Sequence, residues 1–124
     1  DDIVNTLIEV GIYDEINAMP DKINTVIHAS NPGLNSDLSY SLNLARVILK
    51  KSNFLLLDEL PNSLLNNKAG VAYKNLIESA RGNRTLFFVS QREDHINMAD
   101  QVIVMNPGAR PLVLSIDNFL EKYG

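Results

Sequence analysis

The sequence contains no cysteine, which excludes a disulfide framework and a thiolate metal site. This absence is in keeping with a reducing compartment. No apolar stretch approaches the ~20 residues that a membrane-spanning helix needs. No signal peptide is visible, because the chain opens on Asp1-Asp2, which carry the wrong charge for one. The acidic start without methionine leads us to expect a piece of a longer protein.

Basic residues are too few and too scattered for a nucleic-acid surface. The formal net charge is −4, with 11 Lys and Arg against 15 Asp and Glu. The length of 124 residues suits one domain or part of a larger one, and the apolar content is enough for a core. His28 and His95 lack metal-ligand spacing to other histidines or carboxylates, so we expect both at the surface.

Residues 54–59 (FLLLDE) are the most informative stretch of the chain. Four large apolar residues without alternation predict a strand buried on both faces of a parallel sheet. Asp58 and Glu59 follow directly, at the strand end beyond which ligands bind in open α/β sheets. We expect such a pair to hold Mg²⁺ on a nucleotide and to orient a water molecule. An apolar run before two acids is also typical of a plain core strand with a solvated end.

Helices come first along the chain and strands alternate with helices afterwards, which predicts an α/β fold. Ser36 is the expected N-cap of the helix that begins near it, with Asp37 in its first turn, and Asp117 is the expected cap of the last helix. The aromatic side chains of Phe54, Phe87 and Phe88 are predicted to lie in the core. Helices are predicted over 3–10, 12–18, 36–50, 66–80, 93–98 and from 117, strands over 54–57, 85–89, 102–105 and 112–114, and turns at 31–33 and 106–108.

Five segments follow one another in the order and spacing of a known family. Listed with the family pattern, they are Met19-Pro20-Asp21 with Thr25-Val26 (LPxGYDTxV), Leu44-Ala45-Arg46 (LAR), Lys50-Lys51 running into FLLLDE (ILLLDE), residues 85–92 TLFFVSQR (TVIIITHR) and residues 99–105 ADQVIVM (ADRIIVL). With these segments, nearly the whole chain resembles the C-terminal part of an ABC transporter nucleotide-binding domain. The exporter and type I secretion branch is the most similar.

The resemblance implies an incomplete P-loop NTPase fold of the ABC ATPase kind. Residues 1–50 would form the helical subdomain that bears the signature motif. Residues 51–124 would form the C-terminal part of the α/β core, a partial parallel sheet with the Walker B and switch strands, flanking helices and a C-terminal hairpin.

The resemblance also assigns roles to the site residues, with ATP and Mg²⁺ as cofactors. Asp58 stands at the Walker B position and would hold Mg²⁺ through water. Glu59 stands at the general-base position, and Gln91 replaces the switch histidine. The signature, which grips the γ-phosphate on the opposite subunit through a helix N-terminus, aligns with Leu34, Asn35, Ser36, Asp37 and Leu38.

Several motifs depart from the family pattern. Asp37 replaces the second signature glycine, and its carboxylate would repel a phosphate, so we interpret this signature as disabled. Asp37 is equally well explained as an ordinary first-turn helix acid. Leu65 replaces the aspartate that ends the loop after Walker B, and Gln91 carries no titratable proton. The segment 28–30, which would contact the membrane domain, has lost its charges. No phosphate loop occurs in the sequence, so these residues alone are predicted to be inactive.

The function that the resemblance implies is that of the ATP-binding domain fragment of an ABC exporter, with weakened catalysis. Its partners would be a second nucleotide-binding domain and the transmembrane domain, at the cytoplasmic face of the inner membrane, and the fragment itself would be soluble. The alternative is a non-catalytic degenerate ABC domain that serves dimerisation or regulation. A receiver-like signalling domain fits the length but needs both an acidic pair after a first strand and a lysine after a late strand, so it is the least favoured interpretation. Since the strand at 54–57 would lack upstream partner strands, we also expect an open apolar sheet face or edge.

Overall fold

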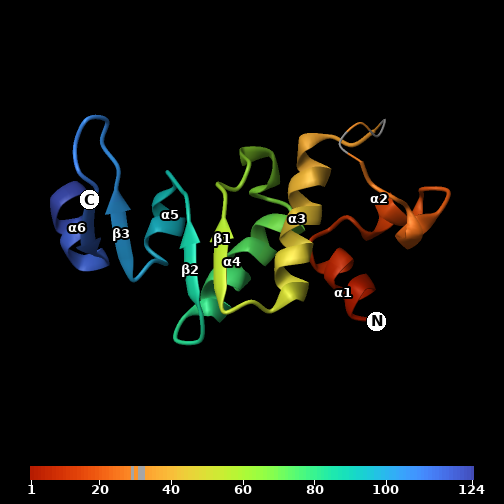
Figure 1. Cartoon of the computed structure of the whole chain (residues 1–124), viewed down its shortest axis with the longest axis horizontal. Helices are drawn as coiled ribbons and strands as arrows, with labels where there is room; N and C mark the ends of the chain where they lie inside the picture. The colour runs from red at the N-terminus through yellow and green to blue at the C-terminus, as the bar shows by residue number, and fades with distance from the viewer. Residues whose placement is uncertain (29, 31–32) are drawn as a thin grey trace. The chain divides into compact units, whose positions relative to one another are not determined.

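A computed structural model describes residues 1–28, 30 and 33–124. The chain divides into two compact units, Asp1–Val89 and Ser90–Gly124, and each is described by itself (Figure 1). The predicted turn at 31–33 and the segment 28–30 lie partly outside the described residues. The predicted boundary between residues 50 and 51 stays a prediction. Within the described ranges, no helix combines the length and apolar character needed to cross a membrane.

The first unit begins with helices, as the apolar spacing predicts. The α-helix α1 (Asp2–Glu9) is capped by Asp1, whose side chain accepts a hydrogen bond from the Ile3 N–H. Gly11, at φ +82°, turns the chain after α1, where the sequence predicts the helix to end. The further helical segments of this unit are α2 (Tyr13–Asn17), the 3₁₀ turns η1 (Lys22–Asn24) and η2 (Asn62–Leu64), α3 (Ser36–Lys50) and α4 (Lys68–Ala80).

The N-cap of α3 is Asn35, so the expectation of Ser36 is wrong by one residue. Asn35 has extended backbone angles, and its Oδ1 accepts a hydrogen bond of 2.8 Å from the Leu38 N–H. This is the geometry of an N-cap, in which the side-chain oxygen satisfies an otherwise unpaired donor of the first turn. Asp37 lies in the first turn, as predicted. The helix ends at Lys50, and Lys51 adopts a left-handed conformation with φ +49°.

A two-stranded parallel sheet follows the helices of the first unit. Strand β1 (Phe54–Leu57) pairs with β2 (Thr85–Phe88), with Leu55 opposite Leu86 and Leu57 opposite Phe88. The helix α4 connects the two strands and packs against β2 (Figure 1). Leu55, Leu57 and the fully buried Tyr73 of α4 belong to the core. The partial parallel sheet that the sequence predicts is therefore present.

The expectation that β1 is buried on both faces is wrong. Exposure alternates along the strand, and the side chains of Phe54 and Leu56 are 52% and 69% exposed. Phe87 lies opposite Leu56 and is 44% exposed, so the predicted core position of Phe54 and Phe87 is also wrong. The reason is that α4 covers only one face of the pair, while Phe54, Leu56, Phe87 and Val89 stay exposed; these four side chains are called the open apolar face.

The second unit consists of a hairpin and two short helices. Strands β3 (Gln101–Val104) and β4 (Leu112–Ser115) pair antiparallel, which confirms the predicted C-terminal hairpin. The helix α5 (Glu93–Ile96) precedes the hairpin, and α6 (Ile116–Tyr123) follows it and packs on both strands. The cap of α6 is Ser115, whose Oγ accepts from the Asn118 N–H at 3.2 Å, so the expectation of Asp117 is wrong.

The open apolar face predicts that the chain self-associates in solution. Moving these four exposed apolar side chains out of water lowers the free energy of the system. We expect Leu56→Lys to weaken this association about tenfold or more, since burial of one leucine contributes ~1.5–3 kcal/mol. Light scattering over a concentration series measures the effect. Val71→Lys, at a 60% exposed position of α4, is the matched control. A monomeric wild-type chain with slowly exchanging β1 amides would contradict the prediction.

Candidate functional site

The acidic pair lies where the sequence predicts it, directly beyond the end of β1. The side chains of Asp58 and Glu59 are both exposed. The Oδ1 atom of Asp58 accepts a hydrogen bond of 2.8 Å from the Glu59 N–H. This bond fixes one oxygen of the Asp58 carboxylate at a strand end that is open to solvent.

A hydrogen bond from Tyr40 connects α3, the helix that begins at the signature position, to the acidic pair. Its hydroxyl donates a hydrogen bond of 2.9 Å to the carbonyl oxygen of Asp58. Burial, and then the negative charge of Asp58, raise the pKa of Tyr40 to about 12. The pKa of Tyr73 is raised too, first by burial and then by Tyr40, Glu59 and Asp58. The charges of the acids therefore raise the pKa values of two tyrosines, and one of these, Tyr40, is in direct contact with the pair. Sequence reasoning missed both, because no local pattern pairs residue 40 with residue 58.

The residues aligned with the signature surround the start of α3. Asn35 and Ser36 are exposed, Leu34 and Asp37 are partly buried, and the side chain of Leu38 is only 2% exposed. Any contact of Leu38 with a ligand would therefore run through its backbone, and its N–H already donates to Asn35. Their predicted role in nucleotide binding stays a prediction.

A hydrogen bond joins this helix start to the loop after the acidic pair. The Ser63 hydroxyl, in η2, donates to the Asp37 carboxylate at 2.7 Å. The two residues are 26 positions apart in the chain, and sequence reasoning did not pair them. The negative charge of Asp37 is thus held in the first turn of α3, where a helix favours an anion.

The loop after the acidic pair is packed tightly against α4. Leu60 and Leu64 are 3% and 5% exposed. Gly70 of α4 has no room for a side chain, because an added Cβ would lie against the carbonyl oxygens of Leu64 and Leu65. This close approach fixes the position of η2, and with it that of Ser63, relative to α4.

Gln91, the residue at the switch position, belongs to the second unit and comes after β2 and before α5 in the sequence. It is exposed and lines an open depression of about 620 Å³. The other residues that line the depression are Arg92, Glu93, Asp94 and Asn97. The predicted assembly of Gln91 with Asp58 and Glu59 into one site stays a prediction.

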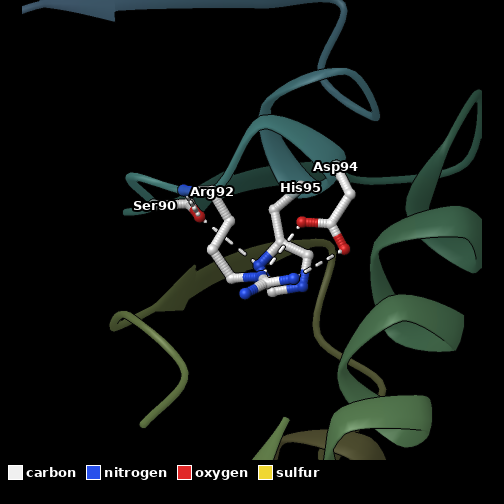
Figure 2. A network of polar contacts seen from close by, with 4 residues as sticks. All are labelled: Ser90, Arg92, Asp94 and His95. Atoms are coloured by element: carbon white, nitrogen blue, oxygen red, sulfur yellow. Dashed lines mark hydrogen bonds and ion pairs between the residues drawn. The ribbon is translucent and has the colours of Figure 1, made fainter. Parts of the chain in front are cut away.

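A network of polar contacts joins Ser90, Arg92, Asp94 and His95, which lie on either side of Gln91 in the sequence (Figure 2). The Arg92 guanidinium donates to both oxygens of Asp94, at 3.0 and 3.3 Å. The Oγ atom of Ser90 lies 3.3 Å from Nδ1 of His95. His95 is 1% exposed, so its predicted surface position is wrong. Ser90 and His95 are five residues apart in the sequence, and sequence reasoning did not pair them.

The acidic pair offers carboxylate oxygens of the kind that Mg²⁺ binds, but the sequence lacks the other parts of a complete nucleotide site. Among the described residues, no group of three or more His, Cys, Asp and Glu side chains converges to hold a metal ion. Mg²⁺ commonly keeps several waters and takes one or two carboxylates together with substrate phosphates, so Asp58 suits it. ATP does not fit these residues alone, because the sequence contains no phosphate loop.

Comparisons with known proteins point to one class of transporter. No protein-family model matches the chain. The chain is 31% identical to ATP-binding cassette sub-family B member 5 of Homo sapiens over 108 residues, which are 87% of this chain and 8% of that protein. It is 29% identical to the ATP-dependent lipid A-core flippase of Thiobacillus denitrificans over 108 residues, which are 87% of this chain and 18% of that protein.

The fold resembles part of a solved exporter. The structure of a bacterial Atm1-family ABC exporter with ATP bound matches with a TM-score of 0.72 and 20% sequence identity, over 99% of this chain and 21% of that chain. The predicted resemblance to ABC exporters is thus confirmed over most of the chain. The chain spans 8% and 18% of the two curated relatives described above.

The contact between Tyr40 and Asp58 leads to a prediction about alkaline stability. Because the pKa of Tyr40 is raised to about 12 from 10.0, the unfolded chain loses the hydroxyl proton at lower pH than the folded chain. The free energy of unfolding should therefore fall between about pH 10 and 12. Tyr40→Phe should cost ~1 kcal/mol at pH 8 through the lost hydrogen bond and should flatten this fall.

Urea unfolding at a series of pH values measures both effects. Tyr13→Phe, on α2, is the matched control. Equal alkaline slopes for the wild type and Tyr40→Phe would refute the assignment.

Proposed function

We propose that the chain is the C-terminal part of the ATP-binding domain of an ABC exporter, which couples ATP binding and hydrolysis to export across a membrane. The observation that carries this proposal is the Asp58-Glu59 pair at the end of a parallel strand, tied by Tyr40 to the helix that starts at the signature position. The similarity to ABC exporters over most of the chain supports it. A type I secretion role is a finer prediction of the same kind.

Each residue of the site has a role in this proposal. Asp58 would hold hydrated Mg²⁺, and Glu59 would accept a proton from the attacking water. Gln91 donates a hydrogen bond from its amide to a phosphate oxygen. Residues 34–38 face the γ-phosphate of ATP held by the opposite subunit. Bound Mg²⁺·ATP supplies the phosphoryl group and the charge neutralisation at the phosphates.

The proposal requires partners beyond these 124 residues. A phosphate loop has to come from a longer polypeptide or from another chain. A second nucleotide-binding domain completes the site across a dimer, and a transmembrane domain receives the conformational change. The site would then face the cytoplasm. We expect no ATP hydrolysis from these residues alone.

A second candidate function is a non-catalytic ABC domain that serves dimerisation or regulation. The start of α3 favours it. Asn35 already occupies the Leu38 N–H, and Asp37 places a carboxylate in the first turn, held by Ser63. Because a helix start that is capped and negatively charged disfavours a second anion, the signature position would grip a phosphate poorly.

Glu59→Gln in the intact transporter tests catalysis. If Glu59 is the general base, its loss should slow ATP hydrolysis by roughly 10²-fold or more while bound ATP accumulates. The measurements are phosphate release and retention of radiolabelled ATP. Glu78→Gln, at an exposed position of α4, is the matched control. Unchanged hydrolysis would count against the general-base role, and no hydrolysis in the unmutated protein would favour the non-catalytic function.

Asp37→Asn and Asp37→Gly test whether the negative charge of Asp37 keeps the signature position from binding a phosphate. If Asp37 repels the γ-phosphate, both variants should raise the rate of ATP hydrolysis, because both remove the negative charge from the first turn of α3. Asp37→Asn keeps an oxygen that accepts from Ser63, so it separates charge from the loss of the hydrogen bond. Rates that stay at the wild-type level in both variants would show that Asp37 is an ordinary first-turn acid.

A further inference from the structure

We propose that His95 is a positioning residue that acts through Ser90 to hold Gln91 in place for its contact with the nucleotide phosphate. This inference rests on the proposed function, since that function gives Gln91 its ligand. Its structural part rests on the contacts of Ser90 with Arg92 and His95, which Figure 2 shows.

The Ser90 hydroxyl links the two sides of Gln91. Its Oγ accepts a hydrogen bond of 3.1 Å from the Arg92 N–H, which closes a small turn over Gln91. The same Oγ lies 3.3 Å from Nδ1 of His95. A hydroxyl has one proton and two lone pairs, so it can accept from Arg92 and still either donate to or accept from the imidazole. The chain of contacts from His95 to Arg92 therefore exists in either tautomer of His95.

His95 provides the fixed end of this chain of contacts. It is 1% exposed, so its ring has little freedom to move. It also belongs to α5, whose end is held by the hydrogen bonds from Ile96 N–H to the Arg92 carbonyl and from Asn97 N–H to the Glu93 carbonyl. Arg92 also forms an ion pair with Asp94, but the two side chains are 41% and 40% exposed. Exposed pairs contribute little, so the anchor is the buried imidazole.

A neutral residue at the switch position makes such an anchor useful. A charged imidazole attracts a phosphate over a range of distances, whereas a neutral amide needs a short and well-aligned hydrogen bond. Gln91 is exposed and has a long side chain, so a mobile backbone beneath it would lower the share of molecules with productive geometry. Fixing the residues on both sides of Gln91 limits that loss.

The first experiment measures the anchor itself, by amide hydrogen exchange at Arg92 in this chain. His95→Leu and Ser90→Ala should each speed exchange of the Arg92 N–H by roughly fivefold, the effect of one hydrogen bond. The double variant should exchange no faster than the single variants, because both substitutions break the same chain of contacts. Ser90→Thr, which keeps the hydroxyl, and His95→Asn, which keeps a polar atom near the place of Nδ1, should restore slow exchange. Unchanged exchange in Ser90→Ala would overturn the anchoring, even if His95→Leu does not fold.

The second experiment measures the consequence for Gln91, through ATP hydrolysis by the intact transporter. Ser90→Ala should lower kcat several-fold with little change in KM, and Ser90→Thr should restore it. Arg110→Gln, at an exposed position of the hairpin turn in the same unit, is the control. Faster exchange at Arg92 with unchanged kcat would overturn the link to Gln91. Absence of hydrolysis in the unmutated transporter would defeat the proposed catalytic function, while the exchange data would still decide the anchoring.

Discussion

The parallel pairing of β1 with β2 is the constraint on which the rest of the first unit depends. Parallel strands end at the same edge, and the Val89 N–H extends the pairing by donating to the Leu57 carbonyl at 3.2 Å. The crossover helix α4 then has to cover one face, and Leu55, Leu57 and Tyr73 are buried there. Asp58 and Glu59 directly follow the end of β1 at this edge. The strand pairing therefore sets their position, and the loop after them does not.

Local patterns in the sequence predict most elements, because helix and strand periodicity depend on neighbouring residues. The helix over 36–50 and the strand over 54–57 have the predicted bounds. The caps are wrong by one or two residues because adjacent polar side chains compete, and backbone angles decide between Asn35 and Ser36. Long-range contacts are the part that sequence could not provide. The bonds from Tyr40 to Asp58 and from Ser63 to Asp37 join residues 18 and 26 positions apart, and no periodicity encodes them.

The candidate site combines an exposed acidic edge with a helix start that is capped and negatively charged. Asp58 and Glu59 stay open to solvent, whereas the start of α3 satisfies its own donor through Asn35 and carries the charge of Asp37. The two parts are physically connected, since Tyr40 and Asp37 lie on the same helix and contact the segments on either side of Glu59. The start of α3 is therefore linked by hydrogen bonds both to the acidic pair and to the loop that follows it.

Gly11, after α1, and Gly70, in the first turn of α4, both mark places where the chain packs closely around the start of α4. A Cβ on Gly11 would lie 2.9 Å from Cβ of Lys68, and a Cβ on Gly70 would meet the carbonyl oxygens of Leu64 and Leu65. The first turn of α4 therefore packs closely against two segments. One is the end of α1, and the other is the loop after the acids. Movement of that loop toward α4, or of α4 toward the end of α1, would bring atoms that are already close into steric overlap, so the packing resists both movements.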